Sequence, residues 1–100
     1  MKDVRITAMK RAVHTDLIEL YENPIEHACD TEIGSVYVSK NGKKPEGLCS
    51  AAWDSMATFV ITLAHGGENF YDGWMKNPKS AMISCNDGFR PVSFLLEVIE

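Results

Sequence analysis

The chain has 100 residues, enough for one hydrophobic core and too few for two, so we expect a single domain spanning residues 1–100. Ten Lys and Arg against 14 Asp and Glu give a net charge of −4, which argues against nucleic acid as a partner. Apolar residues make up 45% of the chain, yet no apolar run is long enough to cross a bilayer, so no membrane partner is expected. Residues 1–15 also lack the apolar core of a secretory signal, which predicts a cytoplasmic protein with reduced thiols.

The first half of the chain predicts two strands and a short helix. Apolar and polar residues alternate over residues 4–8, as in a half-buried strand. A capping sequence at residues 14–16 precedes a short apolar stretch, which predicts a helix of about two turns ending before Asn23 and Pro24. The acidic, aperiodic residues 22–34 indicate a loop, and the β-branched residues 35–39 a second strand.

The longest periodic segment predicts a helix over residues 49–64. Its apolar residues recur at helical spacing along one face, and Gly66 with Gly67 would end it. Residues 65–80 have no period and read as a long irregular loop, a kind of segment that often carries function.

The last segment predicts a hairpin with strands over residues 81–85 and 92–99. Pro91 has no N–H to donate, so we expect a three-residue loop through Phe89 that places Cys85 opposite Pro91. Together these elements predict an α+β fold, a small and mainly antiparallel sheet of about four strands with one long helix packed on one face.

Two cysteines occupy positions that favour thiol chemistry. Cys49 begins the long helix, where the helix dipole and two upstream lysines would stabilise a thiolate. Cys85 ends a strand before a turn that supplies Asp87 and Arg90. In an enzyme, Cys49 would be the nucleophile or proton donor and Cys85 its partner. Asp87 would then orient the thiols, and Arg90 would bind an anionic group of the substrate.

The same residues have a purely structural interpretation. Cys49 would then be a small buried apolar residue, since free cysteine is among the most buried residue types. Asp87 would be the residue that a turn requires, and Arg90 a surface charge.

A metal site is an alternative for the thiols. Cys29, Cys49 and Cys85 would be three ligands of zinc or iron, with His27 or His65 as a fourth, because zinc favours tetrahedral sets of sulfur and nitrogen. The three cysteines are widely separated in the sequence and lack the close Cys-x₂₋₄-Cys pair of structural zinc sites, which argues against this alternative.

An aromatic group offers a ligand pocket or an interaction surface. Trp53, His65, Phe70 and Trp74 would line an apolar pocket for a small molecule at the end of the long helix. Trp53 also fits the core at helical spacing, and His65 fits a residue that complements the helix dipole. With Tyr71, the loop aromatics would alternatively form the contact surface of a homodimer.

Two motifs carry a resemblance. Residues 44–55 read KPEGLCSAAWDS and residues 85–100 read CNDGFRPVSFLLEVIE. With the Gly66-Gly67 pair, they resemble a family of small uncharacterised prokaryotic proteins of about this length, sometimes described as repeat proteins. The family pattern is Pro-Glu-Gly-x-Cys-x-x-Ala-Trp followed by Cys-x-Asp-Gly-x-Arg-Pro-Val-x-Phe. The matching positions are Pro45, Gly47, Cys49, Trp53, Gly67, Cys85, Asp87, Gly88, Arg90 and Pro91.

The resemblance implies no particular activity, but it places two motif cysteines beside a motif acid and a motif base. The leading hypothesis is therefore a thiol-based site, built from Cys49 and Cys85, that acts on a small anionic molecule. A metal-binding protein and a non-enzymatic, self-associating module are the alternatives. Whether the chain is an enzyme stays open at this point.

Overall fold

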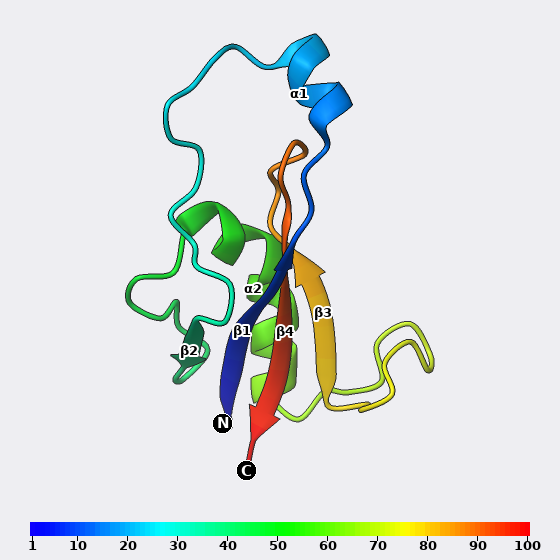
Figure 1. The fold of residues 1–100 in the computed structure, drawn as a ribbon. Coiled ribbons are helices and arrows are strands. Elements are labelled where there is room, and N and C mark those ends of the chain that lie inside the picture. The colour runs from blue at the N-terminus through cyan, green and yellow to red at the C-terminus, as the bar shows by residue number, and fades with distance from the viewer.

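The computed structural model describes all residues from 1 to 100. Its single sheet has four strands in the order β2-β1-β4-β3, and every neighbouring pair is antiparallel. The strands are β1 (Asp3–Arg11), β2 (Val36–Ser39), β3 (Ser80–Ser84) and β4 (Val92–Ile99). Figure 1 shows β1 and β4 side by side in the middle, with both chain termini at the same end of the sheet. The predicted α+β class with a four-stranded antiparallel sheet is confirmed.

Two helices complete the fold. The long helix α2 (Ser50–Ala64) packs against β1, β3 and β4, as predicted, and leaves the other face of the sheet without a helix. The short helix α1 (Thr15–Tyr21) stands away from the sheet and has no buried residue. The expectation of one long helix is therefore only partly matched. Neither helix is long and apolar enough to cross a membrane.

The core lies between α2 and the sheet face that it covers. Alternation along the central strands puts Val4 and Ile6 of β1 on this face, and Ile6 pairs with Leu96 of β4. From α2, Met56, Val60 and Leu63 pack onto them at helical spacing. The apolar periodicities of the helix and the strands thus explain which faces meet.

The end of α2 requires glycine, as predicted. Gly66 has a φ of +91°, a left-handed conformation that residues with a Cβ rarely adopt. The next residue, Gly67, donates its N–H to the Thr62 carbonyl at 2.9 Å. A Cβ there would lie 2.5 Å from the Thr62 side chain, so the chain reverses tightly against the helix.

A β-bulge near the end of β1 changes which side its last residue faces. Ala8 pairs with Phe94, but the register then shifts, so that Lys10 pairs with Ser93 and Arg11 with Val92. Since paired residues of antiparallel strands share a face, Arg11 lies on the side of buried Val92, the side covered by α2. Strict alternation from Ala8 would have turned Arg11 to the open face.

The hairpin forms, but the predicted register is wrong by one residue. Ser84 pairs with Ser93, and the Cys85 N–H donates to the Val92 carbonyl at 3.0 Å, so Cys85 lies opposite Val92 rather than Pro91. The Asp87 carboxylate widens the loop because it accepts the backbone N–H of Phe89 at 2.8 Å. Pro91 therefore lies outside the ladder, where its missing N–H costs nothing.

Candidate functional site

A cavity of about 360 Å³ opens beside the start of α2. One wall is the loop segment His27–Thr31, another is Tyr37 of β2, and a third is formed by Gly47 and Cys49. Two of the three cysteines, Cys29 and Cys49, thus line the same cavity. The partner predicted for Cys49 from the sequence is Cys85, not Cys29.

Local conformation positions Cys49 at this cavity. Leu48 is buried in the core and fixes the chain just before α2, while Cys49 is the exposed N-cap residue of the helix. Gly47, with a φ of +85°, allows the turn that precedes them, and Tyr37 lies beside it. The predicted placement of Cys49 at the start of the helix is confirmed, whereas the alternative of a buried Cys49 is wrong.

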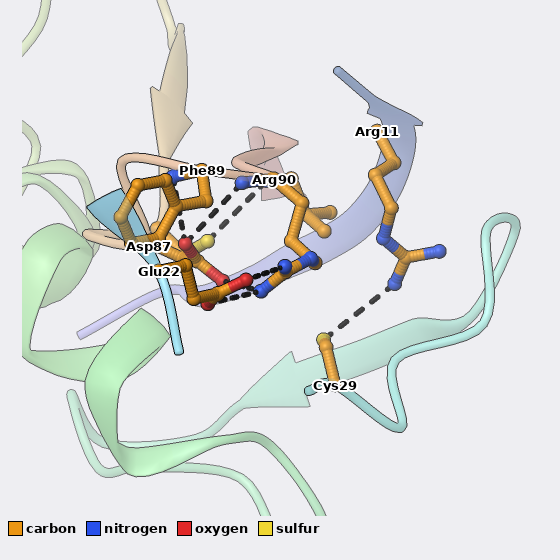
Figure 2. A network of polar contacts seen from close by, with 8 residues as sticks. Arg11, Glu22, Cys29, Asp87, Phe89 and Arg90 are labelled. Atoms are coloured by element: carbon orange, nitrogen blue, oxygen red, sulfur yellow. Dashed lines mark hydrogen bonds and ion pairs between the residues drawn. The ribbon is translucent and has the colours of Figure 1, made fainter. Parts of the chain in front are cut away.

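Cys29 has the more distinctive electrostatic surroundings. Arg11 Nη2 lies 3.5 Å from its Sγ and donates to the Thr31 carbonyl at 2.6 Å, and Figure 2 shows the guanidinium reaching toward the thiol. Burial raises the pKa of Cys29, but its hydrogen bonds to Thr31 and the positive charge of Arg11 outweigh burial. The net pKa of Cys29 is therefore lowered, which favours the thiolate.

The same loop carries a histidine with a carboxylate partner. His27 Nε2 forms a short contact with Asp30 Oδ1, and both residues line the cavity. The hydrogen bond and the charge of Asp30 raise the pKa of His27. The imidazole therefore keeps its proton to higher pH than a free histidine does, and it can act as a proton donor at this wall.

Cys85 has a different environment. It is half-buried, packs against the hydrophobic core, and its Sγ accepts the Val92 N–H at 3.3 Å. No cavity and no hydrogen bond joins it to Cys49. The structure thus does not bring the predicted Cys49/Cys85 pair together.

Arg90 is engaged by two carboxylates of the chain itself. Its guanidinium forms a bidentate pair with Glu22, the residue after α1, and also lies 3.5 Å from Asp87 Oδ2. Figure 2 shows the Glu22 carboxylate against the Arg90 guanidinium. The Arg90 and Glu22 side chains are each only 15% exposed. These contacts pin the end of α1, and with it the start of the cavity-lining loop, to the hairpin.

These contacts shift the pKa values of Arg90 and Asp87, the two charged residues of the hairpin loop. The hydrogen bond to Glu22 raises the pKa of Arg90. Burial raises the pKa of Asp87, but the backbone N–H groups of Phe89 and Arg90, with the Arg90 charge, outweigh it and lower the pKa below its ordinary value. The predicted orienting acid thus has a clear structural partner in Arg90.

This lowered pKa predicts how stability depends on acid. Because the pKa of Asp87 is lower in the folded than in the unfolded chain, its contribution is present above about pH 4 and is lost as the pH falls through the folded pKa. Urea unfolding between about pH 2 and 5 should therefore show a flatter pH dependence for Asp87→Asn than for the unaltered protein. The exposed Asp54→Asn is the control. Equal slopes for both variants would contradict this role of Asp87.

The predicted metal ligands are not gathered. The structure contains no group of three or more His, Cys, Asp or Glu side chains arranged to hold a metal ion. Cys29 and Cys49 share a cavity with His27, but Cys85 lies against the core and His65 ends α2. Binding of zinc or iron stays a prediction without support from the geometry.

The predicted aromatic pocket is also not assembled. Trp53 packs against the core, as its alternative interpretation predicted, and Phe70 packs on Phe59 with ring centres 5.1 Å apart and ring planes tilted by 59°. Trp74 is 44% exposed and meets the edge of Tyr71, which is 74% exposed. Trp53, Phe70, Trp74 and His65, the four residues predicted to line the pocket, line none of the cavities in the structure. Self-association through the exposed pair Tyr71 and Trp74 stays a prediction.

Comparison with protein-family models, with curated proteins and with solved structures finds no match to this chain, so the family resemblance stays a prediction.

Arg11 and Glu22 are not among the site residues predicted from the sequence. Arg11 lies three residues beyond the alternating segment 4–8, so an extension of the first strand could have indicated its position, but not the face of the sheet on which it lies. Glu22 offered no signal, because its partner Arg90 lies 68 positions away.

Proposed function

We propose that the chain carries a thiol-based site in the cavity shared by Cys29 and Cys49, and that Cys29 is its nucleophile toward a small electrophilic molecule. The observation that carries the proposal is the Arg11 guanidinium 3.5 Å from the Cys29 sulfur, at a cavity that also holds a second thiol. A thiolate, rather than a thiol, is the reactive form, and a neighbouring guanidinium stabilises it.

Other residues of the cavity have roles that suit this chemistry. Cys29 attacks an electrophilic centre of the bound molecule, and His27, whose pKa is raised by Asp30, supplies a proton to the group that leaves. Arg11 contacts Cys29 beside the cavity, and its positive charge would favour small electrophiles that carry an anionic group. Arg90, the anion-binding residue predicted from the sequence, pairs with Glu22 and links the end of α1 to the hairpin.

Thiol alkylation tests the proposal. Reduced protein is treated with limiting iodoacetamide between about pH 5 and 10, and mass spectrometry of peptides gives the rate at each cysteine. We expect Cys29 to react fastest at neutral pH, with an apparent pKa below the ordinary value of about 8.5. Cys29→Ser should remove the fast phase, while Cys85→Ser, the matched control, should retain it. A Cys29 that titrates near 8.5 or reacts only in denaturant would refute the proposal.

A further inference from the structure

Two thiols at one cavity suggest what the electrophile is. A thiolate attacks the O–O bond of a peroxide, and a second thiol within reach converts the resulting sulfenic acid into a disulfide. Cys29 and Cys49 line one cavity, while Cys85 is held against the core by its contact with Val92. The arrangement therefore provides one partner for Cys29 and excludes the third cysteine.

We propose that hydroperoxides are substrates of this site, with Cys29 as the attacking thiol and Cys49 as the thiol that resolves its sulfenic acid into a disulfide. This inference rests on the proposed function, because the same Cys29 thiolate performs the attack.

The first step oxidises Cys29. The Cys29 thiolate attacks one oxygen of a hydroperoxide, an S–O bond forms, and the O–O bond breaks. The sulfur is oxidised by two electrons, and the hydroperoxide is reduced to an alcohol, or to water if the substrate is hydrogen peroxide. His27 lines the same cavity beside Asp30 and supplies a proton to the departing oxygen.

The second step forms the disulfide. The Cys49 sulfur attacks the sulfur of the Cys29 sulfenic acid, an S–S bond forms, and the S–O bond breaks. The oxygen leaves as water with the proton of the Cys49 thiol and one further proton carried by the sulfenic acid. Reduction of the disulfide by an external dithiol returns both cysteines to thiols and completes a cycle.

The second step requires the two sulfurs, which line the same cavity, to come into contact. A disulfide needs Cα atoms roughly 4.4–6.8 Å apart. Cys49 is exposed at the start of α2, whereas Cys29 lies in a segment without helix or strand between Glu22 and Gly34. Glu22 holds the start of that segment to Arg90, and Thr31, two residues after Cys29, accepts a hydrogen bond from Arg11. The residues around Cys29 belong to no helix or strand, and the second step requires them to move across the cavity once the contact with Arg11 is lost.

Loss of charge at Cys29 favours this movement. The contact between Arg11 and the Cys29 sulfur is strong only while the sulfur is a thiolate. Once the sulfur is a sulfenic acid, the attraction weakens and the side chain is released toward Cys49. Arg11 thus stabilises the Cys29 thiolate before oxidation and holds the sulfenic acid only weakly afterwards.

The test oxidises the reduced protein with one equivalent of hydrogen peroxide and maps disulfides by mass spectrometry without reductant. We expect a Cys29–Cys49 disulfide that dithiothreitol reverses. In Cys49→Ser, the Cys29 sulfenic acid should persist and be trapped by dimedone. Cys85→Ser is the control, and it should form the disulfide as the unaltered protein does. Circular dichroism confirms that each variant is folded.

The outcomes separate this inference from the proposed function. Rapid alkylation of Cys29 without a Cys29–Cys49 disulfide would overturn the peroxide chemistry and leave the reactive thiol intact. A disulfide that includes Cys85, or equal dimedone labelling with and without Cys49, would overturn it as well. Slow alkylation of Cys29 together with no reaction toward peroxide would overturn both.

Discussion

Replacement of Phe94 by alanine is expected to lower the free energy of unfolding by about 3–5 kcal/mol. Phe94 lies on β4, one of the two central strands, and is only 1% exposed beneath α2. Removal of its ring leaves a cavity that the sheet and the helix can only partly close. A loss of this size is a large share of the roughly 5–15 kcal/mol that stabilises a domain of this class.

Leu95→Ala is the matched control for Phe94→Ala. Leu95 is the next residue of β4 and points to the opposite face of the sheet, which no helix covers. Urea unfolding should show a loss well below that of Phe94→Ala, because half-exposed Leu95 leaves no enclosed cavity. Equal losses at the two positions would mean that both faces of the sheet are covered in solution.

Replacement of Arg11 by glutamine is expected to slow alkylation of Cys29 at neutral pH by roughly five- to tenfold. The Arg11 guanidinium is one of the groups that lower the pKa of Cys29, so its removal should raise that pKa and shrink the thiolate fraction. Iodoacetamide rates measured against pH separate this effect from unfolding, because a raised pKa shifts the whole profile to higher pH.

Two further variants of β1 complete this test. Arg11→Lys retains the positive charge and should recover part of the rate. Arg5→Gln removes an arginine of the same strand that pairs with Glu97 at 3.4 Å on the exposed side, and it should leave Cys29 unchanged. If Arg5→Gln and Arg11→Gln slowed Cys29 equally, net charge rather than the local contact would control the thiol.

The elements of the fold could be read from the sequence because their signals are local. The helix over residues 49–64 and the strand over residues 92–99 have strong periodicities, and both are present with bounds shifted by at most one residue. The hairpin register failed by one position because the Asp87 side chain, rather than backbone geometry alone, sets the loop.

The site was less predictable than the fold. The sequence correctly placed Cys49 at the start of a helix and Asp87 beside Arg90, since both relations span few residues. The sequence could not identify the residues that Cys49 and Arg90 meet in the folded chain. Arg90 pairs with Glu22 from the other end of the chain, and Cys49 shares its cavity with Cys29 from an aperiodic loop.

The sequence by itself therefore determined the class of the fold, the long helix and the four strands, because hydrophobic periodicity and turn residues act over a few neighbouring positions. Only the tertiary structure decided that Cys29 is the cysteine in contact with the Arg11 guanidinium. A single bulge in β1 turns Arg11 toward the side of α2, and only the folded chain brings the loop with Cys29 beneath it. Arg11 and Cys29 belong to different segments, and no local sequence pattern relates them. Their contact therefore arises only once the sheet has formed.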